Sequence, residues 1–486
     1  MTTSLTERLE VYTPHDDQRK AIDFVLEHKD VLLKAPTGAG KTLVGVQSAL
    51  EAGAKVILLI APLNTESGWA ETFRRQWQDT IDFHVVSSKA KGKVAFQNIN
   101  DKVPGVYFVG REYFKRLSWT KVKPDFIIFD ECHAATNRKS LMFKMLKTAK
   151  APYKLAMSAT PAGNKMEGLW SLGRWLWPRQ IPVGFWNWAT EWFHTEVDEH
   201  ASYDIERSDG ETSTIQGKKV TVEREPGALW KNLPAAFKME SVYKETPTVH
   251  WIEVDISPTQ RKHYRELEEE AITWLGENPL AVDIPAVMNA RLRQICLAVP
   301  SVKQDWVKRK DKDTGIWMDV WGDVVWFEED AKSTKIDALV EILSDLHAEV
   351  AEPVVVFTDS RIFAQILTLR LQKKNYEARQ FIGGMSALER AWKKDNFGVL
   401  YDIVVCTIPT VAEGLDGWQK FCKHEVWMNV SWNQLLNVQA AGRLSRQGQK
   451  NEVQRYMIVA KDTVETKQIG KLKSTQQLLD AGYGDI

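Results

Sequence analysis

Residues 31–53 read VLLKAPTGAGKTLVGVQSALEAG, and this stretch decides the fold of the first part of the chain. The apolar VLLK predicts a buried strand, APTGAGKT a loop, and TLVGVQSALEAG a helix. In this order the loop's backbone N–H groups and the positive helix end surround an anion, so the stretch predicts a phosphate-binding loop. The residues expected to hold the phosphates are Pro36, Thr37, Gly38, Ala39, Gly40, Lys41 and Thr42.

An acidic pair supplies the rest of the expected chemistry. FIIFDECH at 126–133 places Asp130 and Glu131 at the carboxyl end of a strand, where parallel sheets bind their ligands. A triphosphate needs one carboxylate for Mg²⁺ and a second to orient and deprotonate water. Asp130 fits the first role, with the Thr42 hydroxyl as a further Mg²⁺ ligand, and Glu131 fits the second. Lys41 is expected to neutralise the β and γ phosphates.

Two series of short, β-branched runs predict the fold class. Runs that are apolar throughout belong to strands buried on both faces, as in a parallel sheet covered by helices. The chain is therefore predicted to be α/β, with two doubly wound parallel-sheet lobes and a ligand-binding cleft between them. The runs are VILLIA (56–61), VYFV (106–109), FIIFD (126–130) and KLAMSAT (154–160), then VVVFT (354–358), DIVVCT (402–407), EVWM (425–428) and QRYMIV (454–459).

The composition excludes several classes of protein. The 486 residues include 64 Lys and Arg and 64 Asp and Glu, and 44% are apolar, which is typical of a globular protein. Four scattered cysteines are too few for a disulfide framework or a zinc site, and indicate a reducing compartment. Neither a signal peptide nor a membrane-spanning run is recognisable, so we expect a soluble cytoplasmic protein without membrane contact.

Zero net charge requires any contact with nucleic acid to be local. Residues 443–473 hold eight Lys and Arg against three Asp and Glu, and are either part of such a contact or a solvated helical face.

Tryptophans and two inserts interrupt the pattern. Six of the 20 tryptophans fall between Trp170 and Trp192, and core packing is favoured over stacking on bases. Residues 201–223 are polar and predict an exposed loop or hairpin, while residues 309–330 predict a β-hairpin. Both inserts are candidates for gripping duplex or a protein partner.

Several motifs together resemble those of superfamily 2 helicase-like ATPases, and further stretches resemble the Swi/Snf branch. The likeness covers residues 13–465. It implies two RecA-like lobes, ATP with Mg²⁺, and nucleic acid as the partner. The ordered motifs are APTGAGKT (35–42), DECH (130–133), SATP (158–161), TVAEGLD (410–416) and QAAGRLSRQGQ (439–449); the branch stretches are SATPAGNKMEGLWSLGRWLWP (158–178), ISPTQRKHY (256–264), LRQICLAVP (292–300), STKIDALVEIL (333–343) and SWNQLLNVQAAGRLSRQGQ (431–449).

The resemblance implies roles for single residues. Gln18 corresponds to the family's adenine-reading glutamine, and Gly414 and Asp416 are expected on the ribose side. Arg443 and Arg446 correspond to arginine fingers that reach the γ-phosphate, which Gln439 should also approach. The residues expected to couple hydrolysis to lobe movement are His133, Ser158 and Thr160, although His133 taken alone is more often structural.

The sequence departs from the Swi/Snf pattern at three positions. Cys132 stands where the family has alanine, Asn429 where it has aspartate, and Gln434 where it has proline.

By the same resemblance a nucleic-acid strand should cross both lobes and be held mainly at its phosphates. Taken singly, each candidate could instead be a helix cap or an ordinary surface residue. The candidates are Asn64, Thr65, Arg111, Ser360, Arg361, Gly384, Ser386 and Thr407.

The expected organisation has four parts: lobe 1 over residues 1–165, a Trp-rich helical insert with a polar loop over 166–250, a helical lead-in over 251–345 with a hairpin insert at 301–332, and lobe 2 over 346–486. The expected function is a DNA-stimulated ATPase that translocates on duplex DNA, acting as a monomer in a bacterial cell or phage-infected host. Two alternatives stay open: an RNA or single-strand helicase, and an ATP-gated nucleic-acid clamp.

Overall fold

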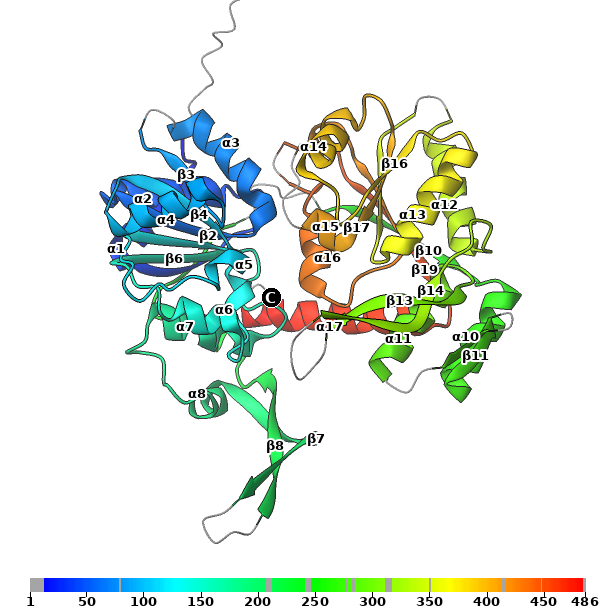
Figure 1. The fold of residues 1–486 in the computed structure, drawn as a ribbon, viewed down its shortest axis with the longest axis horizontal. Coiled ribbons are helices and arrows are strands. Elements are labelled where there is room, and N and C mark those ends of the chain that lie inside the picture. Colours follow the sequence, from blue (N-terminus) through cyan, green and yellow to red (C-terminus); the bar gives the residue numbers. More distant parts are fainter. Residues whose placement is uncertain are drawn as a thin grey trace, which may run out of the picture. The chain divides into compact units, whose positions relative to one another are not determined.

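The computed structural model describes residues 13–77, 80–206, 212–240, 246–275, 278–281, 285–310, 317–348, 351–412, 417–446 and 448–483. The chain forms two compact units (Figure 1). Unit 1 comprises Met1–Val242 and Thr475–Ile486, and unit 2 comprises Tyr243–Ser474.

Unit 1 is built on a seven-stranded parallel sheet in the order β3-β4-β2-β5-β6-β1-β9. Every residue of β2, β4 and β5 is buried, as expected for strands that are apolar throughout. The strands are β1 (Asp30–Lys34), β2 (Val56–Ala61), β3 (Phe83–Val86), β4 (Gly105–Gly110), β5 (Phe126–Asp130), β6 (Tyr153–Ser158) and β9 (Ala236–Lys238).

Helices of unit 1 alternate with these strands, and an antiparallel hairpin of β7 (Phe193–Glu206) and β8 (Thr212–Glu223) extends from it (Figure 1). The hairpin covers the segment expected to be a polar loop or hairpin. The helices are α1 (Asp16–His28), α2 (Lys41–Glu51), η1 (Leu63–Thr65), α3 (Glu66–Trp77), α4 (Ala90–Asn100), α5 (Arg111–Phe114), η2 (Cys132–Ala135), α6 (Leu141–Leu146), η3 (Met166–Gly168), α7 (Leu169–Leu176), α8 (Phe185–Trp192) and α9 (Ala228–Lys231).

Unit 2 contains a second parallel sheet, of six strands in the order β10-β19-β18-β15-β17-β16. The two sheets confirm the predicted α/β fold of two doubly wound lobes. The strands are β10 (Thr248–Val254), β15 (Val354–Thr358), β16 (Ala378–Phe381), β17 (Ile403–Thr407), β18 (His424–Trp427) and β19 (Gln454–Ala460).

Two antiparallel hairpins, β11 (Ile272–Leu275) with β12 (Asn278–Ala281) and β13 (Ser301–Lys310) with β14 (Trp317–Trp326), belong to unit 2. The second is the hairpin predicted around residues 309–330. The helices of this unit are α10 (Pro258–Glu270), α11 (Pro285–Leu297), α12 (Thr334–Leu346), α13 (Arg361–Lys373), α14 (Ala387–Asn396), α15 (Ile408–Ala412), η4 (Trp418–Lys420), α16 (Gln434–Ala441) and most of α17 (Val464–Gly482).

The tryptophans clustered at residues 170–192 are core residues, as favoured from the sequence. Four of them are buried, and Trp186 and Trp192 are partly buried against the same core. Lys154 is also buried there, and its Nζ donates to the carbonyls of Trp175 and Leu176 at 2.9 Å each, which satisfies the end of α7.

The end of the chain departs from the expected organisation. Residues 475–486 were expected in lobe 2, but they cluster with unit 1 because Leu479 and Tyr483 are buried in its core. All four cysteines are buried and free. Within the described ranges, no helix is long and apolar enough to span a bilayer.

Candidate active site

The loop after β1 is shaped by two glycines in the left-handed region, Gly38 with φ 82° and Gly40 with φ 78°. Gln18, only 1% exposed, lies directly behind it. Its Nε2 donates to the Ala39 carbonyl at 3.0 Å, and its Oε1 accepts from the His15 N–H at 2.9 Å. A Cβ on Gly40 would lie 2.2 Å from that Nε2, and the left-handed φ would strain any L side chain, so both features favour glycine. Adenine reading by Gln18 stays a prediction.

Lys41 begins α2 and folds back over the loop. Its Nζ donates to the carbonyl oxygens of Ala35 at 3.1 Å and Pro36 at 3.3 Å. The charge of the ammonium favours the ionised form of both Asp130 and Glu131, although burial still raises the pKa of Asp130 overall. One cation thus faces both the loop that should hold the phosphates and the acidic pair, and Thr42 follows it in the first turn of the helix.

Asp130 ends β5 and is 8% exposed, with its Oδ1 accepting from the Glu131 N–H at 3.0 Å. Burial raises the pKa of Asp130 to about 6, and the neighbouring charge of Glu131 adds to the rise. Glu131 has φ 49°, in the left-handed region that a non-glycine residue rarely adopts. Strain of this kind persists where the surrounding structure holds the residue in place.

Glu131 is held by the residues expected to couple hydrolysis to movement. Ser158 Oγ donates to Glu131 Oε2 at 2.8 Å, and His133 Nδ1 lies 3.2 Å from the same oxygen and 3.1 Å from Ser158 Oγ. The Thr160 N–H donates to Ser158 Oγ at 3.1 Å. Burial alone would raise the pKa of Glu131, but the hydrogen bonds and charges of its neighbours outweigh burial and lower it. These bonds favour the ionised form of Glu131, whose oxygens can orient a water molecule by accepting its hydrogen bond.

Mg²⁺ suits these donors. Thr42 and Asp130 offer oxygen ligands, and a divalent cation would offset the burial of the Asp130 charge. Among the described residues no group of three or more His, Cys, Asp or Glu could hold a metal alone. Mg²⁺ commonly takes one or two carboxylates and completes its shell with phosphates and water, so the small donor set fits it.

In unit 2, the predicted nucleotide residues lie around α16. Gln439 is 4% exposed within that helix. Arg443 follows it and donates from Nη2 to the Ala412 carbonyl. Gly414 and Asp416 lie outside the described residues. The action of Arg443 and Arg446 on a γ-phosphate stays a prediction.

The carboxyl edge of the unit 1 sheet is divided between two sets of predicted residues. The phosphate loop, the acidic pair and Ser158 follow or end β1, β5 and β6, which are consecutive in the sheet. Thr65 and Arg111 follow the adjacent β2 and β4. A Cβ on Gly110 would lie 3.2 Å from Leu63, so these two loops approach each other closely. The side chain of Asn64 lies outside the described part of the chain.

The predicted residues of unit 2 gather in the same way, after the neighbouring strands β15, β17 and β16. The Arg361 guanidinium lies 3.7 Å from where a Gly384 Cβ would be, and Thr407 Oγ1 is 2.7 Å from Thr410 Oγ1. Ser360 and Ser386 cap α13 and α14, each Oγ accepting a backbone N–H at 3.2 Å. The cap role left open for such residues therefore applies to both serines. Nucleic-acid binding by this set stays a prediction.

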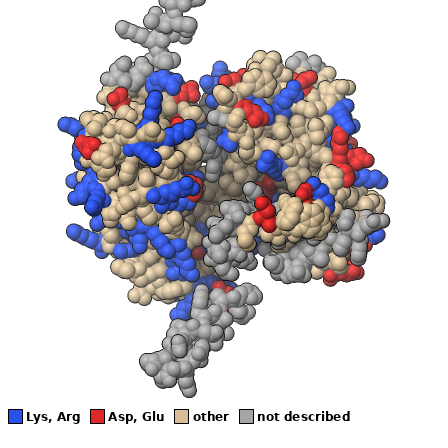
Figure 2. Space-filling view, in the orientation of Figure 1, with Lys and Arg blue, Asp and Glu red and all other residues tan. Residues whose placement is uncertain are grey.

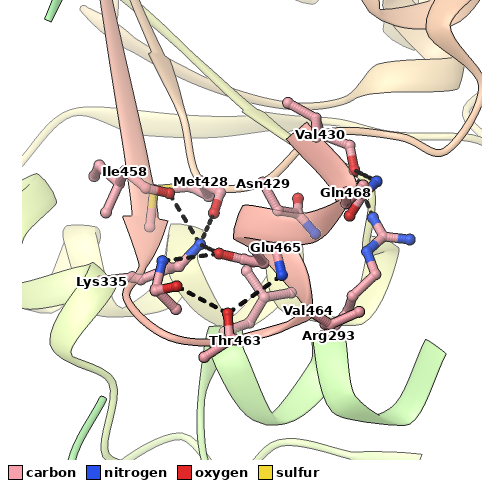
Figure 3. Close-up of polar contacts among 12 residues, drawn as sticks. Arg293, Lys335, Met428, Asn429, Val430, Ile458, Thr463, Val464, Glu465 and Gln468 are labelled. Carbon is pink, nitrogen blue, oxygen red and sulfur yellow. Dashed lines mark hydrogen bonds and ion pairs between the residues drawn. The ribbon is translucent and has the colours of Figure 1, made fainter. Parts of the chain in front are cut away.

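A buried polar network in unit 2 carries residues to which the sequence alone gave no role (Figure 3). Lys335, with a fully buried side chain, donates from Nζ to the Met428 and Ile458 carbonyls and to Glu465 at 2.6 Å. Its position in the STKIDALVEIL stretch was the available signal.

A second buried cation in Figure 3, Arg293, hydrogen-bonds to the segment just after β18. Arg293 Nη2 donates to the Val430 carbonyl at 2.6 Å and to Asp359 Oδ2 at 3.0 Å, and Gln468 Nε2 reaches the same carbonyl at 3.1 Å. Arg293 thereby connects the segment after β18 to Asp359, the residue immediately before Ser360.

Asn429, which stands where the Swi/Snf pattern has aspartate, joins the end of β15 to the segment after β18. Its Oδ1 accepts from Thr358 Oγ1 at 3.0 Å and from the Asp359 N–H at 2.8 Å. An aspartate oxygen could accept both bonds, so this departure from the pattern preserves the connection between β18 and β15.

Comparisons with known proteins find relatives of this chain. Residues 15–168 match the DEAD/DEAH box helicase family. An uncharacterized ATP-dependent helicase of Bacillus subtilis, YqhH, is 22% identical over 98% of this chain and 80% of its own length. The ATP-dependent helicase brm of Drosophila melanogaster is 25% identical over 93% of this chain and 28% of its own, so this chain spans less than a third of that relative.

The Sulfolobus solfataricus SWI2/SNF2 ATPase core in complex with dsDNA aligns over 98% of this chain and 94% of its own, with 17% identity and a TM-score of 0.39. The sequence comparisons confirm the resemblance that the motifs indicated, to superfamily 2 helicase-like ATPases of the Swi/Snf type.

Proposed function

We propose that this Swi/Snf-type helicase-like ATPase hydrolyses ATP in unit 1 and uses the hydrolysis to translocate on duplex DNA. The observation that carries the proposal is the placement of Glu131, which accepts a hydrogen bond from Ser158 and lies 3.2 Å from His133, on the sheet edge that also carries the phosphate loop. A direct hydrogen bond between the carboxylate of Glu131 and the SATP motif would link hydrolysis to movement, as a motor requires.

The chemistry follows from positioning and charge. Glu131 orients the attacking water and accepts its proton, while Lys41 and the loop N–H groups neutralise the β and γ phosphates. Mg²⁺, held by Thr42 and Asp130, would supply further neutralisation of the phosphate charge. Ser158 and His133 keep the strained Glu131 backbone from relaxing away from the nucleotide.

Charge supports a polyanionic partner. Residues 89–150 hold fourteen Lys and Arg against five Asp and Glu, although the whole chain is neutral. Figure 2 shows Lys and Arg gathered over the part of unit 1 where Figure 1 places α4 to α6. Phosphate contacts of this kind are independent of sequence, which suits movement along any duplex.

The test is ATP hydrolysis with duplex DNA, single-stranded DNA and RNA, run beside displacement of a triplex-forming strand. The proposal expects the greatest stimulation by duplex, displacement that requires ATP, and the loss of both in Lys41→Ala. Greatest stimulation by RNA or single strands would instead identify a helicase of the same superfamily. ATP-dependent binding without displacement would identify a clamp, and DNA-stimulated hydrolysis that survives Lys41→Ala would reject the site.

The expected monomeric state and cytoplasmic location stay proposals. For the inserts, the β7–β8 and β13–β14 hairpins both remain candidates for gripping duplex or a protein partner, and the second carries exposed aromatic side chains. Its Trp306 and Trp321 are 64% and 53% exposed, with ring centroids 5.4 Å apart. Deletion of residues 309–330 without loss of DNA affinity would reject a grip on duplex.

A further inference from the structure

The last two turns of α17, from Thr475, are part of unit 1, although the longer first part of this helix belongs to unit 2. Leu479 and Tyr483 are each only 4% exposed, and both belong to the hydrophobic core that surrounds the seven-stranded sheet. A tyrosine this deeply buried requires a partner for its hydroxyl.

That partner is a backbone group of the catalytic region. The Ala162 N–H donates to Tyr483 Oη at 2.8 Å. The Tyr483 ring packs edge-to-face on Trp230, with centroids 5.0 Å apart at 83°. Lys34 Nζ lies over the same ring, 4.5 Å from its centroid. Three contacts of different kinds therefore fix the tyrosine.

Ala162 directly follows the SATP motif, whose first residue holds the catalytic carboxylate. Ser158 Oγ donates to Glu131 and accepts from the Thr160 N–H, and the Gly163 N–H donates to the Thr160 carbonyl at 2.9 Å. The short loop is thus anchored at its start by Glu131 and just beyond its end by Tyr483.

The same tyrosine contacts the residue before the phosphate loop. Lys34 is followed by Ala35, whose carbonyl accepts from Lys41 Nζ at 3.1 Å. Tyr483 therefore contacts a residue next to each of the two loops that act on the nucleotide in the proposed function. Its hydroxyl is the part whose removal leaves the Ala162 N–H buried without its acceptor.

We propose that Tyr483 is a positioning residue of the ATPase: by holding the Ala162 N–H, it fixes the loop that carries Ser158 and thereby the placement of Glu131. It is buried in the core of unit 1, so its loss should slow hydrolysis without weakening substrate binding. The inference rests on the proposed ATPase activity of unit 1.

The test is Tyr483→Phe, which removes one oxygen and keeps the ring against Trp230 and Lys34. A buried hydrogen bond of ordinary strength corresponds to a fall of about 3- to 10-fold in kcat with saturating duplex DNA. KM for ATP and Kd for DNA should stay within about 2-fold of wild type. The matched control is Tyr107→Phe, which changes a buried tyrosine of the same unit whose hydroxyl donates to the Val103 carbonyl at 2.8 Å, just before β4.

An unchanged kcat in Tyr483→Phe would overturn the inference, and so would an equal fall in Tyr107→Phe, which would indicate general loss of stability. Basal hydrolysis without DNA is measured for all three proteins. If wild type hydrolyses ATP without any stimulation by nucleic acid, the translocase proposal fails, and the basal kcat of Tyr483→Phe still decides the positioning role.

Discussion

Replacing Lys335 with methionine should destabilise unit 2 severely. The lysine side chain is fully buried and that of Glu465 is 4% exposed, so neither charge is solvated. The methionine side chain is nearly as long as that of lysine, but it leaves the Glu465 carboxylate without its cation. The carbonyls of Met428 and Ile458 also lose their donor. Breaking a buried ion pair by removing one partner costs about 3–5 kcal/mol.

For a unit of this size, each kcal/mol lowers Tm by about 2–4 °C, so a fall on the order of 10 °C is expected. Thermal and urea unfolding measure it. In the wild type the Ala460 N–H donates to Glu465 at 2.9 Å. The double variant Lys335→Met/Glu465→Gln removes both charges and keeps an amide oxygen that can accept this bond. It should recover more than half of the loss.

The control is Lys373→Met, which breaks a surface pair with Glu329 whose side chains are 67% and 46% exposed. Surface pairs contribute about 0–1 kcal/mol, so this variant should unfold close to wild type. The reasoning is refuted if Lys335→Met is no less stable than Lys373→Met, or if adding Glu465→Gln deepens its loss.

Three further predictions concern unit 1. Gly40→Ala should weaken ATP binding by about 10-fold or more and lower Tm, because a left-handed alanine costs about 1–2 kcal/mol and its Cβ meets Gln18. Since Gln18 is itself expected at the nucleotide, the clash is tested by thermal unfolding: Gly40→Ala should lower Tm less in a Gln18→Ser background than in wild type, and an equal fall in both would contradict the clash. Burial lowers the pKa of Lys34 to about 8, although the charge of Asp480 opposes this, so the folded state disfavours the protonated amine. The stability of the wild type should therefore rise between about pH 8 and 10.5. Lys34→Met should exceed the wild-type Tm by more at pH 7 than at pH 10, and a difference that is the same at both pH values would speak against the lowered pKa. If the Lys and Arg of residues 89–150 bind duplex, replacing Lys144 and Lys147 together with neutral residues should reduce the slope of log affinity for DNA against log salt concentration by up to about two. An unchanged slope would exclude both lysines from the contact.

The lobes and the ATP-site motifs were predictable because each rests on local sequence. A strand that is apolar throughout, such as Val56–Ala61, must be buried on both faces, and Gly38 and Gly40 mark a loop that only glycine can form. The order of strand, loop and helix around Lys41 needs no distant contact. The same locality explains why residues 170–192 were correctly assigned to the core.

What the sequence could not show depends on contacts between distant segments. In the sequence Lys335 is an ordinary charged residue. Only in the fold do two carbonyls, from β19 and just after β18, and a carboxylate of α17 surround it. Tyr483 was expected with lobe 2 because it follows that lobe in the chain. Its burial against Trp230 in unit 1 is a tertiary result that no local pattern announces.

The bond between Ala162 and Tyr483 joins residues 321 positions apart, which has a consequence for synthesis. A ribosome adding about 5–20 residues per second makes Tyr483 some 15–60 s after the SATP loop. During that interval the nascent first lobe lacks its last buried aromatic side chain. An ATPase lobe expressed as a fragment ending near residue 242 would retain this immature state permanently, unless a peptide carrying the Leu479–Tyr483 turn were supplied in trans.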